Sequence, residues 1–330
     1  MASGAESALG GGGPCWSAAG DLPQSAARTL LRLLGGSEPL VTPCAHDALS
    51  ARMIARAGFG AVFVSGFTAA AARGLPDTGL MSYVEMLDVA QSVVAALEGS
   101  GVPVICDADT GYGNALNTKR TIRGYAQAGV ACIMLEDQVH PKRCGHAAGK
   151  AVVERDEALA RIRAACDARR EHGLDILILA RTDARQTHGL EEALERCRLF
   201  RELGADITFL EAPESELEMQ RYCERVPGPK MANMLARGKT PALPPARLAA
   251  LGFSLVAYPL DLLVAATQAM QAALEQLRRG AGPLQPASDA VELVWQLSGF
   301  RAYQRDELRY APRAAAALPA AAQSPAAPGQ

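Results

Sequence analysis

Short runs of apolar, often β-branched residues recur along the chain and alternate with segments that have the apolar spacing of helices. The runs typical of buried strands are 40–44, 61–66, 102–109, 132–137, 175–183, 207–212, 229–234 and 254–259. Helical spacing is clearest at 82–97, 117–128, 154–171 and 190–203, and glycines stand where helix C-caps belong at Gly129, Gly173, Gly204 and Gly252. Strands that are apolar along their whole length are typical of parallel sheets covered by helices. Eight alternating units favour an α/β fold of the (β/α)8 or TIM barrel type over an open sheet.

The two ends of the chain differ from this pattern. Residues 1–24 are rich in Gly, Ala and Ser, and residues 313–330 are rich in Ala and Pro, so we expect two disordered tails. Residues 25–312 then form a single barrel domain with C-terminal helices. An apolar helix at 260–279 and an amphipathic segment at 288–300 exceed what a closed barrel needs, and we expect them to pack on a second copy of the chain.

Composition narrows the class of protein. A chain of 330 residues that is 49% hydrophobic can bury a sizeable core. The net charge of -2 indicates neither a nucleic-acid surface nor a polybasic membrane signal, and no apolar run is long enough to span a bilayer. The first residues lack the apolar core of a signal peptide, which favours the cytoplasm; organellar targeting by this tail is the alternative. The 8 cysteines form no CxxC pair and are expected to be reduced thiols.

Polar residues stand at the ends of the predicted strands. The set comprises Ser65, Gly66, Asp107, Asp109, Glu136, Asp137, Arg181, Asp183, Glu211, Asn233 and Tyr258. In a (β/α)8 barrel, the C-terminal ends of all strands meet on the face that carries the chemistry. We therefore expect residues that are far apart in the sequence to surround one cavity.

Asp107 and Asp109 lie two residues apart in the stretch CDADTGYGN and would point to the same side of a strand. Two such carboxylates repel each other unless a cation lies between them or one of them stays protonated. Oxygen ligands of this kind suit Mg2+ or Mn2+, with waters and substrate oxygens completing the shell. The alternative is a structural pair that caps the next helix and binds arginines.

Cys144 is a single thiol in the charged stretch KRCGH, residues 142–146. A reactive cysteine needs a polar pocket that tunes its proton affinity, whereas a structural cysteine is usually surrounded by apolar residues. An inert loop cysteine remains an alternative. A soft-metal site at His140, Cys144 and His146 is weakly indicated because no second ligand cluster accompanies them. The Arg181–Asp183 pair has its own alternative, a structural salt bridge.

Taken together, the motifs resemble the isocitrate lyase/phosphoenolpyruvate mutase superfamily over residues 38 to 280. They are KRCGH (142–146), LEDQV (135–139), DADTGYGN (107–114), SGF (65–67), GLPDTG (74–79), ARTDA (180–184), EAP (211–213) and ANM…GKTP (232–241). The likeness is greatest to the small lyases, which include 2-methylisocitrate lyases, dimethylmalate lyases and petal-death-type or carboxyvinyl-carboxyphosphonate phosphorylmutase-like proteins. It implies an (α/β)8 barrel with an exchanged C-terminal helix, a dimer of dimers, and use of Mg2+.

The resemblance also implies a role for each matching residue. Asp107 and Asp109 would hold Mg2+, with Mn2+ as a substitute, and Glu136 would lie in the outer shell of the metal. Cys144 would be the acid and base at carbon, and Arg181 would clamp a carboxylate. The remaining residues would bind substrate: Ser65, Gly66, Phe67, Asp77, Gly145 through its N–H, His146, Glu211 and Asn233.

The implied activity is carbon–carbon cleavage of a malate-type 2-hydroxy dicarboxylate into a 2-oxo acid and a carboxylate. Relatives that cleave tricarboxylates tend to carry an arginine where this chain has Val264, so a third carboxylate would lack its partner. This departure favours a C4 dicarboxylate, with or without alkyl substituents. Oxaloacetate hydrolase or decarboxylase activity and phosphorylmutase-like activity are alternatives within the superfamily. A non-catalytic barrel that binds a dicarboxylate is a further alternative, but it would have no need of a thiol at position 144.

Overall fold

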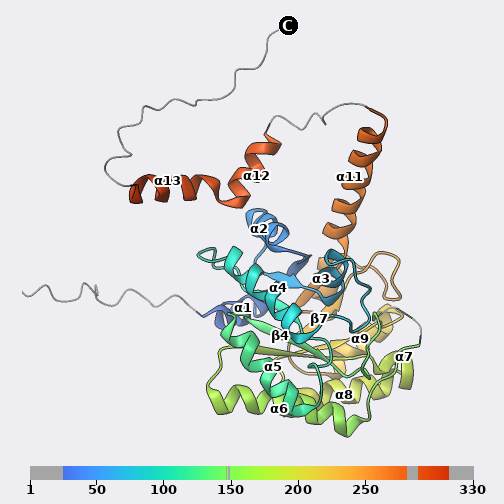
Figure 1. Cartoon of the computed structure of the whole chain (residues 1–330). Coiled ribbons are helices and arrows are strands. Elements are labelled where there is room, and N and C mark those ends of the chain that lie inside the picture. The colour runs from blue at the N-terminus through green and yellow to red at the C-terminus, as the bar shows by residue number, and fades with distance from the viewer. Residues whose placement is uncertain (1–24, 146, 148, 281–288, 312–330) are drawn as a thin grey trace, which may run out of the picture.

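The computed structural model describes residues 25–145, 147, 149–280 and 289–311, and it contains a closed barrel of parallel strands (Figure 1). The strands run in the order β1 to β8, and β8 pairs with β1 from Leu40↔Leu255 to Pro43↔Tyr258. Their bounds are β1 Leu40–Ala45, β2 Val62–Val64, β3 Val104–Asp107, β4 Cys132–Glu136, β5 Leu177–Thr182, β6 Ile207–Leu210, β7 Lys230–Asn233 and β8 Leu255–Tyr258. The predicted (β/α)8 barrel is confirmed.

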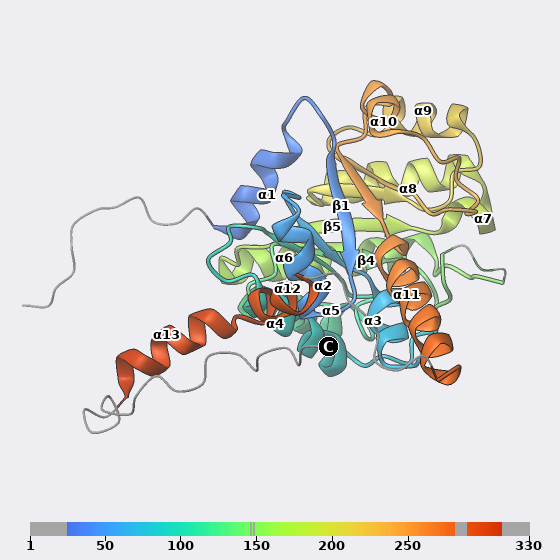
Figure 2. The ribbon, with the colours of Figure 1, turned by 90° about the horizontal axis from the view of Figure 1, so that it is seen from above.

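Helices connect the strands and cover the outside of the barrel (Figure 2). They are α1 Ala26–Leu34, α2 Ala48–Arg56, α3 Gly66–Ala72, α4 Tyr83–Ala96, α5 Ala115–Gln127, α6 Arg155–His172, α7 Ala184–His188, α8 Leu190–Leu203, α9 Glu216–Arg225 and α10 Pro245–Leu251. The helices expected from periodicity agree with α4, α5, α6 and α8 to within two residues. In the described parts of the chain, no helix combines the length and the apolarity that crossing a bilayer requires.

Local signals explain where several helices begin and end. Ser82 and Asn114 accept hydrogen bonds from the first turns of α4 and α5 in reciprocal capping boxes. Gly173 and Gly204 end α6 and α8 in the left-handed conformation, which glycine adopts without a Cβ penalty. Gly129 lies one residue beyond the C-cap of α5 rather than at it.

Two apolar layers hold the barrel together. Alternate strand residues such as Phe63, Ile105 and Phe209 form the interior cluster, and Leu30 of α1 joins them. A second cluster, which includes Val64, Ile122 and Ile133, packs the strands against the surrounding helices. Both layers leave the C-terminal ends of the strands free to carry polar residues.

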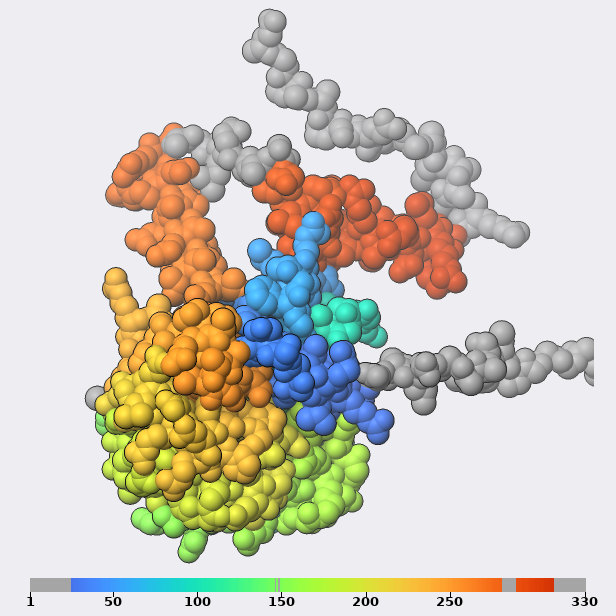
Figure 3. Space-filling model, turned by 180° about the vertical axis from the view of Figure 1, so that it is seen from behind, coloured from blue at the N-terminus to red at the C-terminus, as the bar shows by residue number. Residues whose placement is uncertain are grey.

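Three C-terminal helices follow the barrel: α11 Asp261–Arg278, α12 Ala290–Ser298 and α13 Phe300–Tyr310. Helix α11 projects away from the barrel, and none of its residues is buried (Figure 3). Helix α12 lies beside α2, where Arg52 donates a hydrogen bond to the carbonyl of Leu297. The predicted exchange with a second chain therefore stays a prediction, and α13 was not anticipated. The two predicted tails, residues 1–24 and 313–330, lie outside the described residues.

Candidate active site

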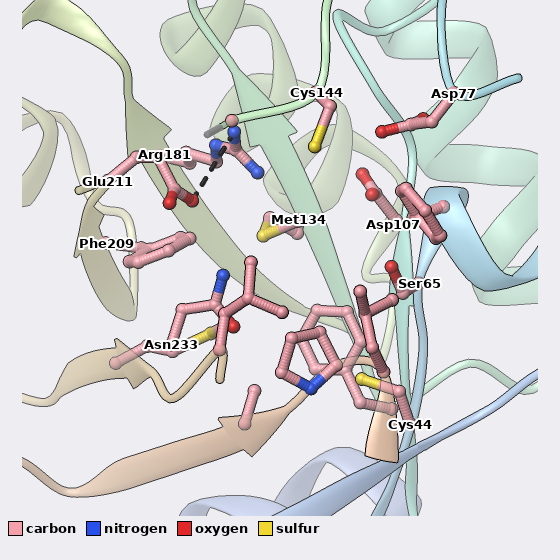
Figure 4. Close-up of a pocket in the computed structure, with 18 of the residues that line it drawn as sticks. Cys44, Ser65, Asp77, Asp107, Met134, Cys144, Arg181, Phe209, Glu211 and Asn233 are labelled. Atoms are coloured by element: carbon pink, nitrogen blue, oxygen red, sulfur yellow. Dashed lines mark ion pairs between the residues drawn. The ribbon is translucent and has the colours of Figure 1, made fainter. Parts of the chain in front are cut away.

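A cavity opens at the C-terminal ends of the strands and measures about 590 Å³ including its mouth. A concave site at the strand ends, with charged and apolar walls, is typical of a small-molecule site. Every strand, or the segment directly after it, contributes to its lining, for example Cys44, Phe63, Asp107, Met134, Arg181, Phe209, Met231 and Ala257 (Figure 4). Among the described residues, the charged ones that line the cavity come from the stretch between the end of β2 and the residue after β6: Asp77, Asp107, Lys142, Arg143, Arg181 and Glu211. The lining supplied around β7, β8 and β1 carries no charge.

Asp107 and Asp109 converge, but not for the reason that the sequence suggested. Strand β3 ends at Asp107, and Asp109 has the left-handed backbone conformation, with φ of 46°. A tight turn rather than strand alternation brings them together, and the Asp109 N–H donates to Asp107 Oδ1 at 3.0 Å. The N–H of Gly66 donates to Asp107 Oδ2 at 3.0 Å, and a Cβ at Gly66 would lie 2.9 Å from Asp107 Oδ2 and 3.1 Å from Asp109 Oδ1. Both carboxylates therefore face one small space beside a glycine.

Lys142 neutralises part of this acidic cluster. Its Nζ forms ion pairs with Asp77 and with Asp109, the latter at 2.9 Å. Burial alone would lower the pKa of Lys142, but Asp109, Glu136 and the other carboxylates raise it well above the usual value. Burial raises the pKa of Asp109 to about 6, although Lys142 opposes the increase. Lys142 therefore stays protonated, and Asp109 is mostly ionised at neutral pH.

The residues present fit a hard divalent cation. Asp107 and Asp109 are both buried, Asp109 and Asp77 share the Lys142 ammonium group, and the Asp107 carboxylate lies beside that of Asp109. Such an excess of converging oxygen atoms is what Mg2+ or Mn2+ requires. Within the described ranges, no set of three or more His, Cys, Asp or Glu side chains forms a complete ligand cluster. Waters and substrate oxygens would therefore have to complete the coordination shell of the cation, as expected for a site with only two protein carboxylates.

Arg181 lies on the opposite side of the cavity, where several carboxylates fix its guanidinium group (Figure 4). Its Nε and Nη2 donate to the two oxygens of Asp183 at 2.9 and 3.0 Å. Glu136 lies 3.3 Å away and Glu211 lies 3.4 Å away. Burial would lower the pKa of Arg181, but Asp183, Glu136 and Glu211 raise it well above the usual value. The structural Arg–Asp salt bridge exists, and it also orients a cation that lines the cavity.

Glu136 does not line the cavity itself. It is buried at the end of β4, and burial raises its pKa well above the usual value despite the nearby Arg181 and Lys142. Its Oε1 has no hydrogen-bond partner among the described residues. Glu136 therefore pairs with Arg181 behind the surface that a ligand would touch.

Cys144 is half-buried on the loop after β4, and its sulfur points into the cavity between Arg181 and Asp77 (Figure 4). The next residue, Gly145, approaches the site closely. A Cβ at Gly145 would lie 2.5 Å from Arg181 Nη2 and 2.8 Å from Glu211 Cδ, so only glycine fits there without movement. The predicted residue His146 lies outside the described residues.

The other predicted residues divide into lining and supporting positions. Ser65, Phe67, Glu211 and Asn233 line the cavity. The buried Oδ1 of Asn233 has no partner within the described chain, so it is available to a donor on a ligand or a water. Gly66 holds Asp107 in place, because its N–H donates to Asp107 Oδ2.

Val264 does not lie where the sequence argument placed it. It is 47% exposed on α11 and is absent from the cavity lining. The residues that close this side are Pro259 and Leu260, which are also apolar. Together with Leu235, they make this wall of the cavity apolar.

Several lining residues were missed in the sequence. Lys142 was noted only as a cation near Cys144, yet it binds two carboxylates across the site. Phe209 lies under the Arg181 guanidinium at 5.4 Å and is indistinguishable in the sequence from other core aromatics. Cys44 lines the base of the cavity from β1. A charged residue close to the end of a predicted strand can be recognised in the sequence as a candidate site residue. An apolar lining residue cannot, because it looks like any other core residue.

Comparison with known proteins agrees with this geometry. The family model for phosphoenolpyruvate phosphomutase matches residues 30–278. A 2,3-dimethylmalate lyase from Eubacterium barkeri is 48% identical over 245 residues, covering 74% of this chain and 83% of the relative. A 2-methylisocitrate lyase from Bacillus subtilis is 38% identical and covers 73% and 77%.

Solved structures of the same superfamily have the same fold as this chain. The crystal structure of 2,3-dimethylmalate lyase superposes with a TM-score of 0.84 at 35% identity, covering 91% of this chain and 99% of that one. Oxaloacetate acetylhydrolase bound to 3,3-difluorooxalacetate also has a TM-score of 0.84 at 35% identity, covering 89% and 100%. Phosphonopyruvate hydrolase in complex with oxalate and Mg2+ has a TM-score of 0.76 at 26% identity, covering 88% and 100%. The chain therefore belongs to the phosphoenolpyruvate mutase/isocitrate lyase superfamily and is a carbon–carbon lyase within it.

Proposed function

We propose that this protein is a Mg2+-dependent lyase that cleaves a malate-type 2-hydroxy dicarboxylate, with or without alkyl substituents, into a 2-oxo acid and a carboxylate. The observation that carries the proposal is the thiol of Cys144, which faces a cavity with Arg181 on one side and Asp77 and Asp107 on the other (Figure 4). The 2,3-dimethylmalate lyase relative supports the substrate class.

Breaking the bond between the hydroxyl-bearing carbon and its neighbour leaves the electron pair on the carbon next to a carboxylate. That carbon becomes an enediolate, which is strongly basic and must be held by cations and N–H donors. Arg181 and the N–H of Gly145 are assigned this role, because both lie at the cavity wall beside Cys144. Cys144 then gives its proton to the carbon, and the thiolate that remains is stabilised by the surrounding cations.

The other half of the substrate would lie against the acidic wall. Asp107 and Asp109 would hold Mg2+, or Mn2+ in its place, with Glu136 behind them. When bound, this ion would polarise the hydroxyl oxygen and its neighbouring carboxylate and favour loss of the hydroxyl proton. Asp77, which lines this wall, is the carboxylate we assign to receive that proton. Ser65, Phe67, Glu211 and Asn233 would position the substrate between the two walls.

The apolar wall formed by Leu235, Pro259 and Leu260 supports the limit on substrate charge. A third carboxylate placed against this wall would lose its hydration without gaining a partner. The loss would weaken binding by about 2 kcal/mol or more. We therefore expect malate and alkyl-substituted malates to be substrates, and isocitrate and 2-methylisocitrate not to be.

Purified protein should be incubated with Mg2+ and a panel of malate, 2- and 3-methylmalate, 2,3-dimethylmalate and 2-methylisocitrate while 2-oxo acid release is monitored. Release from at least one malate, and none from the tricarboxylate, is the expected result. Oxaloacetate belongs in the same panel, because the oxaloacetate acetylhydrolase structure is as similar as that of the lyase. Formation of oxalate and acetate from oxaloacetate, with no malate cleaved, would replace the lyase proposal by a hydrolase.

We also propose a dimer of dimers in the cytoplasm. Helix α11 has no buried residue, and Met270, Leu274 and Leu277 on it are exposed. Helix exchange with a second copy would cover this surface, as the resemblance to the family implies. Light scattering at micromolar concentration should give about four times the chain mass, and a monomer would refute the assembly.

A further inference from the structure

The loop that carries Cys144 leaves the barrel after β4 and returns through a short antiparallel stem. The N–H of Val139 donates to the carbonyl of Ala151, and the N–H of Val153 donates to the carbonyl of Asp137, each at 2.9 Å. This stem fixes the two ends of the loop. It does not explain how the segment around Cys144 is held against the cavity.

Gln138 holds the segment on the N-terminal side of Cys144. Its side-chain Nε2 donates to the carbonyl of Arg143 at 2.9 Å, and its Oε1 accepts from the N–H of Arg143 at 2.9 Å. The amide thus pairs with both backbone groups of one residue, as a neighbouring strand would. Gln138 is buried, so the pair is shielded from competing water.

Lys150 holds the segment on the C-terminal side. Its Nζ donates to the carbonyl of Gly145 and to Asp183 Oδ1, the latter at 2.6 Å, and the side chains of Lys150 and Asp183 are fully buried. Cys144 therefore lies between two residues whose backbone groups are each bound by a buried side chain. Neither Gln138 nor Lys150 lines the cavity.

The Lys150 contact reaches further than the loop. Asp183 Oδ1 also accepts from Arg181 Nη2 at 3.0 Å, so one oxygen serves the loop and the guanidinium group that faces the substrate. Asp183 is fixed in turn, because its N–H donates to Asp137 Oδ1 at 2.9 Å and Asp137 accepts from the buried Arg196. A shift of Lys150 would therefore disturb Cys144 and Arg181 together, whereas a shift of Gln138 would disturb only the loop.

We propose that Gln138 and Lys150 are positioning residues for the lyase reaction: Gln138 and Lys150 hold the two sides of Cys144, and Lys150 couples this loop to Arg181 through Asp183. The proposal rests on the proposed function for its kinetic consequences. Its physical part, the retention of residues 143–145 against the barrel, does not depend on which substrate is cleaved.

Lys150→Met removes the ammonium group and keeps the chain length, and Lys119→Met is the matched control because Lys119 forms a surface ion pair with Glu171. Hydrogen exchange is measured on the ligand-free proteins by mass spectrometry. In Lys150→Met, peptides that contain Gly145 should exchange at least about tenfold faster than in wild type, whereas Lys119→Met should leave them unchanged. Unchanged exchange in Lys150→Met overturns the proposal, whether or not the protein cleaves malates.

Gln138→Glu keeps an oxygen that accepts from the Arg143 N–H but replaces the Nε2 donor by an oxygen that repels the Arg143 carbonyl. Gln220→Glu on the surface of α9 is the matched control. Gln138→Glu should lower kcat about 100-fold with KM within threefold, because only Cys144 is displaced. Lys150→Met should lower kcat similarly and also weaken binding of oxalate with Mg2+ at least about tenfold, because Arg181 loses its orientation. Equal effects of the two variants on oxalate affinity would exclude the coupling. Wild-type kcat in Gln138→Glu would exclude the positioning role even if Lys150→Met fails to fold.

Discussion

Lys142 Nζ and Asp109 Oδ1 form an ion pair of 2.9 Å inside the barrel mouth, with 5% and 6% of their side chains exposed. The pair joins the loop that carries Cys144 to the turn that follows β3. Among the described residues, Asp107 forms no ion pair of its own, although Gly66 donates an N–H to it. The space beside Gly66 is therefore where an added cation would be most strongly attracted.

Mn2+ should bind the wild-type protein with a stoichiometry near one, and binding should be lost in Asp107→Asn and weakened in Asp109→Asn. The reason is that each variant removes one of the two converging carboxylates. Titration calorimetry with Mn2+ alone measures this without any substrate. Asp88→Asn is the control, since Asp88 is an exposed partner of Arg73. Unaltered Mn2+ affinity in Asp107→Asn would remove Asp107 from the metal site.

Cys144→Ser should lower kcat by at least about 100-fold, or ~2.7 kcal/mol of transition-state stabilisation, because a hydroxyl is too weak an acid to protonate carbon at a comparable rate. Binding of oxalate with Mg2+ should change little, because serine is nearly isosteric with cysteine. Cys223→Ser serves as the control, because Cys223 is the other half-buried cysteine in the described part of the chain. If Cys144→Ser keeps more than about a tenth of wild-type turnover, a deficit below ~1.4 kcal/mol, Cys144 is not the essential acid.

Gly145→Ala should cost about 100-fold in kcat/KM. The new methyl group would lie 2.5 Å from Arg181 Nη2, so either the guanidinium group or the loop must move. Steady-state kinetics and thermal melting of the same samples separate a local effect from unfolding. Gly35→Ala is the control, because a Cβ there would be no nearer than 3.5 Å to other atoms. Wild-type kcat/KM in Gly145→Ala would show that the close approach is not needed.

The free energy of unfolding should depend on Asp183 at acid pH. Burial alone would raise the pKa of Asp183, but Arg181 and Lys150 lower it from 3.8 to about 2. The stabilisation from its ionised form is fully present above pH 4 and is lost as the pH falls from about 4 toward 2, an effect of about 2 kcal/mol.

Urea unfolding of wild type and Asp183→Asn between pH 3 and 6 measures this. The variant should be less stable by about 3 kcal/mol or more at pH 6, because Lys150 and Arg181 lose a buried counter-charge. The difference should shrink as the pH falls below 4. A difference that stays constant over the whole range would show that Asp183 does not titrate with a lowered pKa.

The fold could be predicted because each strand and helix carries its own local signal. The apolar run 132–137, for example, includes β4, and Gly204 marks the end of α8. The ranges of α11 and α12 were predictable, but the packing of α12 was not, because it depends on long-range contacts such as Arg52 with Leu297. Periodicity describes which face of a helix is apolar, but not which surface covers it.

The charged half of the site was also largely predictable, since a barrel brings its strand ends together and charged residues are conspicuous there. Asp107, Arg181 and Glu211 do line one cavity. The supporting residues could not be identified in this way. Gln138 and Lys150 act through backbone groups of the loop, and the partner of Lys150 lies 33 residues further along the chain. The tight turn at Asp109 was missed because nothing in CDAD distinguishes an extended strand from a left-handed residue at its end.

The uncharged lining around β7, β8 and β1 suggests how substrate preference in this protein could be altered by laboratory evolution. Leu235, Pro259 and Leu260 contact the cavity but none of the ion pairs that hold Asp109, Arg181 or Asp183. A library confined to these three positions would vary the shape of the pocket while leaving Cys144, Asp107 and Asp109 unchanged. Variants selected on bulkier acids should therefore retain the pH–rate profile of the parent enzyme, since the groups that we propose to exchange protons would be unchanged.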